Sequence, residues 1–366
     1  MPTSAPADTH PVSPPRHKLI TLEAGRFVAA ASVMLGHYTG VVENFRGEAV
    51  FGNLFGTFHI GVPYFYVLSG FIIYHVHRRD IGRPQTISNF VRRRAVRLLP
   101  MFWAISAVML AGFLLSPSLA QERNLTGGGV VADLLLLPHA NAILAISWTL
   151  RHETFFYFLF ALALWLGPRA LWLVAAWIVA SVIASPWNMP EELGRLSIVA
   201  SVLNVGFGLG IGIAILYGSS RRPDHRLCAG AGAAVIAVML VLEWLFNRDS
   251  GRSGAGFGDV GTLVYLIASA ALIYGLVVAE ERWRMPLPRF WQALGGSSYV
   301  LYLIHQPIAS LAFRAVKPLS SVPPGVAFVL LAALAIGAAL VIHLLVERRV
   351  ISWLSARIPS RRSAES

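Results

Sequence analysis

Residues 20–40 read ITLEAGRFVAAASVMLGHYTG, an apolar stretch that nevertheless carries Arg26 and His37. A helix of this length measures about 30 Å, which matches the hydrocarbon core of a bilayer. Ionisable side chains at that depth cost about 2.5–3.5 kcal/mol each, so they face the protein interior and usually serve a function. Since eleven residues make three turns with about 20° left over, Arg26 and His37 project from one face, about 16 Å apart along the axis.

The composition supports a membrane protein. The 366 residues are 56% hydrophobic and 13% charged, whereas soluble domains average about 25% charged. The net charge of +12 comes from basic residues in short loops between apolar runs, which argues against a nucleic-acid-binding domain. The single cysteine, Cys228, excludes a disulfide framework or a Cys-based metal site. The sequence predicts no metal and no permanently bound cofactor.

Apolar runs of membrane-spanning length predict an all-α integral membrane protein with about ten transmembrane helices. The runs are 20–42, 55–77, 96–116, 144–166, 168–186, 198–217, 228–246, 260–279, 294–313 and 324–346. The apolar run 130–144 is too short to span, and we expect it to lie along the interface or to dip in beside the fourth helix. The four glycines from Gly206 to Gly212 fit close helix packing.

Charge between the runs predicts the orientation. With a cytoplasmic N-terminus, the inner segments hold 21 Lys and Arg and the outer loops hold 7, which places both termini in the cytoplasm. The expected organisation is a disordered cytoplasmic tail over 1–18, a transmembrane domain over 19–347 and a basic cytoplasmic tail over 348–366.

Two further segments place polar groups inside the membrane. SWTLRHETFFYF at 147–158 brings Glu153 to a depth comparable to that of His37, where a carboxylate would orient the imidazole. The alternative is a pair between Glu153 and Arg151 or His152. Ser69 and Gly70, in GVPYFYVLSGFIIYHVHRR at 61–79, let a helix or ligand approach closely. No G-x-S-x-G elbow surrounds Ser69, which disfavours a nucleophile.

An arginine cluster and a histidine segment complete the candidate residues. NFVRRRAVRLLP at 89–100 contains Arg93, Arg94 and Arg97, which suit either phosphate binding or topology and anionic lipid headgroups. SSYVLYLIHQPI at 297–308 places Tyr299, Tyr302 and His305 at successive i, i+3 positions, so neighbours share a face. The alternatives are interfacial anchoring for the tyrosines and, for His37, a buried polar group satisfied within the protein.

Together these segments resemble the acyltransferase 3 family over residues about 18 to 347. Five features are shared. The first helix carries an arginine and a histidine separated by ten residues (Arg26, His37), and the second carries FYVLSGF at 65–71, where the family has an FFVLSGF-like run. The others are R-R-x-x-R before a proline (Arg93, Arg94, Arg97, Pro100), a W-S-L-x-x-E-x-x-F-Y-like motif (Trp148, Glu153, Phe156, Tyr157) and an S-Y-x-L-Y-L-x-H-x-P-like motif (Ser298, Tyr299, Leu301, Tyr302, His305, Pro307). The chain departs from the family in LEAGRF, with Glu23 where LDGLRG is usual, and in Pro63, where an acidic residue is frequent.

The resemblance implies transfer of an acyl group, usually acetyl, from cytoplasmic acyl-CoA to a hydroxyl of an envelope or secreted glycan. It implies a location in the bacterial inner membrane. The implied partners are acyl-CoA, membrane lipids and a glycan acceptor, which is lipid-linked in some cases; no nucleic acid is expected. The implied catalytic residues are His37 as base or acyl carrier, Glu153 as the residue that orients it, and Arg26, past which the thioester enters. The implied residues that bind acyl-CoA or substrate are Arg93, Arg94 and Arg97 for the phosphates, Tyr302 and His305 as oxyanion donors, and Ser69 and Tyr299.

Two other functions remain open at this stage. A transporter or flippase of a lipid-linked saccharide would use the same polar residues as a translocation path. A non-catalytic partner in a polysaccharide assembly complex is the third reading. The oligomeric state stays undetermined.

Overall fold

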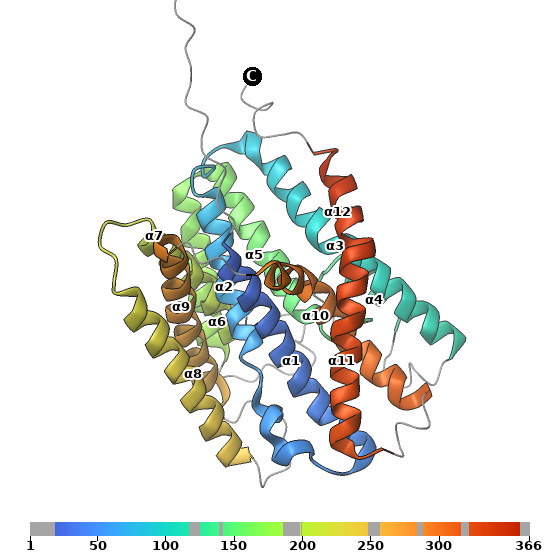
Figure 1. Ribbon diagram of the computed structural model, residues 1–366. Helices are drawn as coiled ribbons and strands as arrows, with labels where there is room; N and C mark the ends of the chain where they lie inside the picture. Colours follow the sequence, from blue (N-terminus) through green and yellow to red (C-terminus); the bar gives the residue numbers. More distant parts are fainter. Residues whose placement is uncertain are drawn as a thin grey trace, which may run out of the picture.

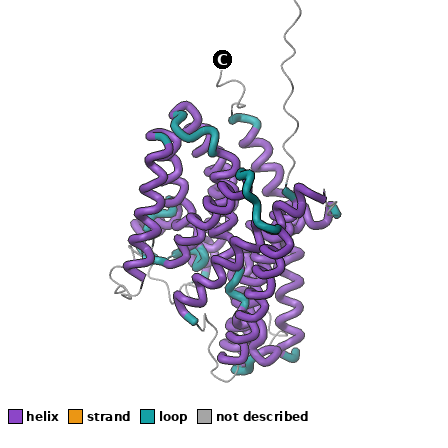
Figure 2. Tube along the Cα trace, turned by 90° about the vertical axis from the view of Figure 1, so that its left-hand side faces the viewer, coloured by secondary structure: helices purple, strands orange, loops and turns teal. Residues whose placement is uncertain are grey.

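The chain is described by a computed structural model, which covers residues 19–116, 125–138, 142–185, 198, 200–247, 257–283, 288–315 and 322–358. The predicted tail 1–18 and the C-terminal residues 359–366 lie outside the described residues. Within the described ranges all regular structure is helical, as Figures 1 and 2 show, which confirms the all-α prediction.

The helices follow the apolar runs closely. They are α1 (Ile20–Arg46), η1 (Val50–Thr57), α2 (Gly61–His77), η2 (Pro84–Thr86), α3 (Ile87–Leu115), α4 (Gly127–Leu134), α5 (Ser147–Leu166), η4 (Pro168–Ala170), α6 (Leu171–Ala184), η7 (Val202–Asn204), α7 (Val205–Tyr217), α8 (His225–Asn247), α9 (Gly258–Trp283), α10 (Arg289–Ala315), α11 (Pro324–Ile342), the π-helix η9 (His343–Glu347) and α12 (Arg348–Ser355). The segment 348–366, predicted as a tail, therefore begins as helix.

Five described helical stretches are long and apolar enough to cross a membrane: Val50–His77, Pro84–Leu115, His225–Phe246, Gly258–Trp283 and Pro324–Ser355. Pro168–Ala184 and Val202–Tyr217 are apolar but shorter. The full set of ten spans and the cytoplasmic location of both termini remain predictions.

Helix α1 lies at the centre of the bundle (Figure 1). It packs on α10 and α2, while α2 packs along α7 and α8 packs on α9. In Figure 1, α8 and α9 form one side of the molecule, and α3 with α11 and α12 forms the other. Together α1 and α2 contact α5, α7, α9, α10 and α11.

One predicted span is divided. The run 55–77 contains a break between η1 and α2: η1 ends at Thr57, Phe58 has the non-helical angles φ −78° and ψ 54°, and α2 begins only at Gly61. A methyl group at Gly61 would overlap the backbone carbonyl of Ala29, so α2 starts in direct backbone contact with α1. This break brings His59 into the interior, as described below.

Glycines set the contact between α2 and α7. A methyl group at Gly70 would overlap the carbonyl oxygen of Phe207, and one at Gly210 would overlap that of Val67. Gly206 faces the Cβ of Tyr66. The prediction of close packing holds for these glycines, whereas a methyl group at Gly212 would meet no atom within 4 Å. The approach fixes Phe207 beside the site.

Gly70→Ala is expected to destabilise the protein by about 1–3 kcal/mol, because the added methyl group must push α7 away from α2. The measurement is thermal unfolding of the detergent-solubilised protein. Gly212→Ala is the matched control, since its methyl group meets open space. The control should be neutral or stabilising by up to about 1 kcal/mol, and equal losses in the two variants would contradict the packing role of Gly70.

Candidate active site

A pocket runs along α2, which lines it from Val62 to Ile73. At 1.5 Å per residue this is about 16 Å of helix. Seven of the residues predicted from the sequence line it: Arg26, Ser69, Arg94, Arg97, Glu153, Tyr299 and Tyr302. These side chains come from five different helices, so only the folded bundle brings them together.

Three predicted residues do not line this pocket: Arg93, His37 and His305. Arg93 is exposed on α3. Arg94 and Arg97 are spaced i, i+3 and share the inward face of the same helix. The sequence alone did not separate these three arginines, because all of them precede Pro100 in one basic run.

Glu153 is the centre of the polar network in the pocket. Its Oε1 accepts a hydrogen bond from the Ser69 hydroxyl at 2.7 Å and another from the Tyr157 hydroxyl at 2.5 Å. Arg94 lies over the Tyr157 ring, with 5.9 Å between its Cζ and the ring centroid. Glu153 therefore contacts Ser69 and Tyr157, whereas the sequence had led us to expect His37, Arg151 or His152 as its partner.

Arg26 lies near one arginine and three carboxylates. It forms an ion pair with Glu23 at 3.6 Å, and its charge also interacts with those of Arg97, Glu153 and Glu347. The start of α1 is anchored by a residue that is remote in the sequence. The Glu280 carboxylate accepts hydrogen bonds from the backbone N–H groups of Ile20 and Thr21 at 2.6 and 2.9 Å. This capping satisfies donors at the helix start and fixes the position of Arg26 further along the same helix.

His37 and His305 form a pair on α1 and α10. The Nδ1 of His37 lies 2.8 Å from the Nε2 of His305, and the two rings are parallel within 4°. The Nδ1 of His305 lies 3.2 Å from the carbonyl oxygen of Leu301, which can only accept a hydrogen bond. His305 therefore carries its proton on Nδ1, so its Nε2 accepts from the Nδ1–H of His37. This arrangement leaves the Nε2 of His37 as the basic nitrogen.

Tyr302 connects the pocket to this pair. Its ring lines the pocket and lies 5.9 Å from the His305 ring, centroid to centroid. Its hydroxyl is 2.9 Å from the Thr149 hydroxyl, and Thr149 donates its own proton to the Ile146 carbonyl at 3.0 Å. The proton of the Tyr302–Thr149 bond therefore comes from Tyr302. Neither Tyr302 nor His305 is left with a free proton for an oxyanion in this state.

His59 was not anticipated from the sequence. It follows η1, its imidazole interacts electrostatically with that of His37, and its Nε2 is buried without a hydrogen-bond partner. A methyl group at Gly36, next to His37, would lie 3.5 Å from the carbonyl oxygens of Phe55 and Phe58, which shows how close this segment lies to α1. No group of three His, Cys, Asp or Glu side chains in the described part of the chain is arranged to hold a metal ion.

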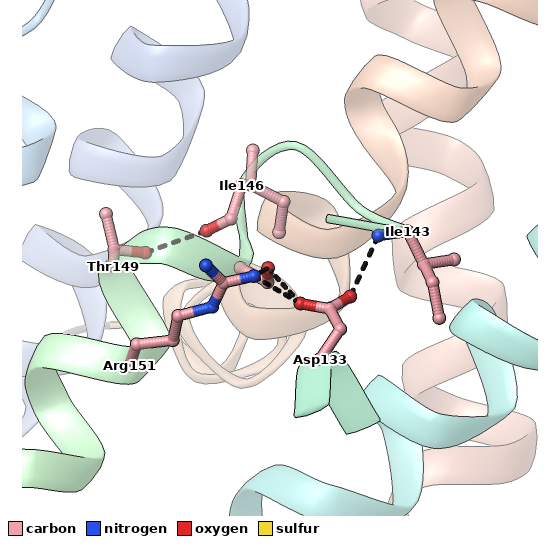
Figure 3. Close-up of polar contacts among 6 residues, drawn as sticks. Asp133, Ile143, Ile146, Thr149 and Arg151 are labelled. Atoms are coloured by element: carbon pink, nitrogen blue, oxygen red, sulfur yellow. Dashed lines mark hydrogen bonds and ion pairs between the residues drawn. The ribbon is translucent and has the colours of Figure 1, made fainter. Parts of the chain in front are cut away.

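A buried ion pair supports α5 beside the pocket. Figure 3 shows Arg151 facing Asp133, which belongs to α4; the Nη2–Oδ1 distance is 2.6 Å. Asp133 is fully buried and also accepts from the Ser147 hydroxyl and from the Ile143 N–H, both at 2.8 Å. The described part of the run 130–144 thus contacts α5 and carries the carboxylate that neutralises Arg151; whether it lies along the interface or dips into the membrane stays a prediction.

The long apolar helices indicate a multi-pass membrane protein, and the pocket, lined by polar and apolar side chains, is its candidate binding site. The acyltransferase domain family, acyltransferase 3, matches residues 19–344, and the chain belongs to this family. The chain is similar to the exopolysaccharide production protein ExoZ of Rhizobium meliloti (strain 1021), with 28% identity over 272 residues, which is 70% of this chain and 78% of ExoZ. No solved structure matches the chain significantly.

Asp133→Ala is expected to destabilise the protein by about 3–5 kcal/mol, because it leaves the buried Arg151 guanidinium without its counter-charge. Denaturation of the solubilised protein measures the loss. The control is Glu281→Ala, which removes the Arg222–Glu281 pair; this pair has the same 2.6 Å distance, but its side chains are 38% and 47% exposed. The control should lose at most about 1 kcal/mol. A loss at Asp133 no larger than that at Glu281 would contradict a structural role for the buried pair.

Proposed function

We propose that the protein is an O-acyltransferase of the bacterial inner membrane that moves an acetyl or other short acyl group from cytoplasmic acyl-CoA to a hydroxyl of an exopolysaccharide. Membership of the acyltransferase family supports the reaction class. The name of the relative ExoZ supports an exopolysaccharide acceptor. One observation carries the proposal. The same pocket is lined by Arg94 and Arg97 and by Tyr302, whose ring lies next to the histidine pair.

The donor would enter at the arginines. Guanidinium groups form forked hydrogen bonds with phosphate oxygens, and CoA carries phosphates at the end of the molecule remote from the thioester. With the phosphates on Arg94 and Arg97, the pantetheine arm would extend along α2, past Ser69. This orientation directs the thioester toward Tyr302 and the histidine pair.

The histidine pair would provide the base. The Nε2 of His37 takes the proton of the acceptor hydroxyl while the hydroxyl oxygen adds to the thioester carbonyl carbon. The C–S bond then breaks, and the sulfur leaves as CoA thiol with the proton from His37, so atoms and charge balance. His305, held by the Leu301 carbonyl, keeps the Nδ1 proton of His37 in place throughout. Transfer through a transient acyl-imidazole would use the same atoms in two steps.

His37→Gln is expected to lower the transfer rate by about 10²–10⁴-fold, since it removes the base but keeps a polar side chain. Membranes holding equal amounts of each variant are incubated with radiolabelled acetyl-CoA and the host's polysaccharide, and label in the glycan is counted. His225→Gln is the control, because this buried histidine packs on Trp283, away from the pocket.

The outcomes separate the candidate functions. Transfer by His37→Gln at the wild-type rate would remove His37 from the chemistry. If the wild-type protein transfers no label but its deletion stops glycan export, the transporter of a lipid-linked saccharide becomes the better reading.

Arg94→Gln and Arg97→Gln are each expected to raise the KM for acetyl-CoA by roughly 10–100-fold, because a hydrogen bond between charged groups contributes about 1.5–3 kcal/mol. Arg93→Gln, at the exposed neighbouring position, should change KM by less than about twofold. Initial rates against acetyl-CoA concentration measure both effects. Equal changes at all three positions would indicate a general effect of membrane-surface charge and contradict a specific phosphate site.

A further inference from the structure

Tyr66 is a polar residue of the pocket that the mechanism above does not use. Its side chain lines the pocket from α2 and is only 3% exposed. Its hydroxyl is buried and has no hydrogen-bond partner. Leaving such a group unpaired costs about 1–3 kcal/mol, and buried hydroxyls in native proteins are nearly always paired. The hydroxyl of Tyr66 is therefore a candidate to be completed by a ligand.

The other hydroxyls that line the pocket are all committed to protein acceptors. Each donates to a neighbouring oxygen: Ser69 and Tyr157 to Glu153, Thr149 to Ile146, Ser298 to Gly295, Tyr299 to Leu98 and Tyr302 to Thr149. The structure describes all of the hydroxyl-bearing residues that line the pocket, and among them only Tyr66 has no acceptor for its hydroxyl proton. A ligand that needs a neutral donor would find it there.

The packing around Tyr66 fixes its ring. The ring centroid lies 4.8 Å from that of Phe207 and 5.8 Å from that of His152. Its Cβ lies against Gly206, where α7 packs on α2. The phenol interacts electrostatically with Glu153 and with Tyr302, both of which line the pocket. Tyr66 is thus held in place between the carboxylate network and the part of the pocket nearest the histidine pair.

We propose that the Tyr66 hydroxyl donates a hydrogen bond to the carbonyl oxygen of the acyl donor's thioester. The inference rests on the proposed function and deepens it. During acceptor addition the carbonyl oxygen gains negative charge, and a donor already fixed in a water-poor site stabilises that charge without reorganisation. The proton stays on Tyr66, and the proton from the acceptor still passes through His37 to the leaving sulfur. This gives to Tyr66 the role that Tyr302 and His305 were expected to fill.

The test compares Tyr66→Phe with Tyr64→Phe. Tyr64 lies on the same helix, is 6% exposed and also has a buried hydroxyl without a partner, but it does not line the pocket. We expect kcat/KM for acetyl-CoA to fall by about 10²-fold in Tyr66→Phe, the effect of losing one such donor, and by less than about twofold in Tyr64→Phe. Melting without ligand should be unchanged or higher in both, because each variant removes an unpaired buried group.

A second measurement identifies the atom that is contacted. Binding of acetyl-CoA is compared with binding of S-ethyl-CoA, a thioether that lacks the carbonyl oxygen. Wild type and Tyr64→Phe should bind acetyl-CoA roughly 3–10-fold more tightly, the effect of one hydrogen bond, and Tyr66→Phe should bind the two equally. An unchanged preference in Tyr66→Phe would overturn the proposal, as would equal activity losses with lowered melting in both variants.

The failure of the proposed function is distinguishable from these results. A wild-type protein that binds neither CoA compound and transfers no label would overturn the acyltransferase proposal, and the role of Tyr66 with it. A wild-type protein that transfers label, together with a fully active Tyr66→Phe, would overturn the role of Tyr66 alone.

Discussion

Polar side chains between apolar helices must find their partners inside the protein, because lipid offers no hydrogen bonds. The bond between Glu153 and Ser69 shows what this constraint does: it ties α5 to α2 across the pocket, at 2.7 Å. Asp133 and Arg151 tie α4 to α5 in the same way, and His37 and His305 tie α1 to α10. Each bond that neutralises a costly group also fixes the relative position of two helices, so the site and the bundle are stabilised together.

The polar groups in and beside the pocket that the proposed reaction uses form two layers. The first layer joins Glu153, Tyr157 and Arg94, and the second layer is the His37–His305 pair. Tyr302 is the side chain that belongs to both, since its ring lines the pocket and lies next to that of His305. A charged ligand end bound in the first layer and a reacting group near the second layer would therefore share one path, which is the arrangement a long donor molecule requires.

Sequence reasoning found the residue types but did not find their partners. Helix periodicity places Arg26 and His37 on one face, yet only Arg26 lines the pocket. Depth in the membrane suggested that Glu153 meets His37, but the rotation of α5 turns Glu153 toward Ser69, and α10 supplies His305 instead. His59 and Asp133 were missed because they depend on a break before α2 and on the burial of a short run. Patterns along one helix do not encode the rotation of another.

The charges around the pocket differ between Arg26 and the α3 arginines. Arg26 has Glu23 at 3.6 Å and interacts with Glu347, which the π-helical turn η9 carries into the interior with 3% exposure. Arg94 and Arg97 line the pocket with Glu153 as the one carboxylate among its lining residues, and that carboxylate already accepts two hydrogen bonds from hydroxyl groups. The excess positive charge therefore lies at α3. A ligand that carries its negative charge at one end and a neutral chain at the other would complement this distribution, with its anionic end at Arg94 and Arg97 and its neutral chain passing the compensated Arg26.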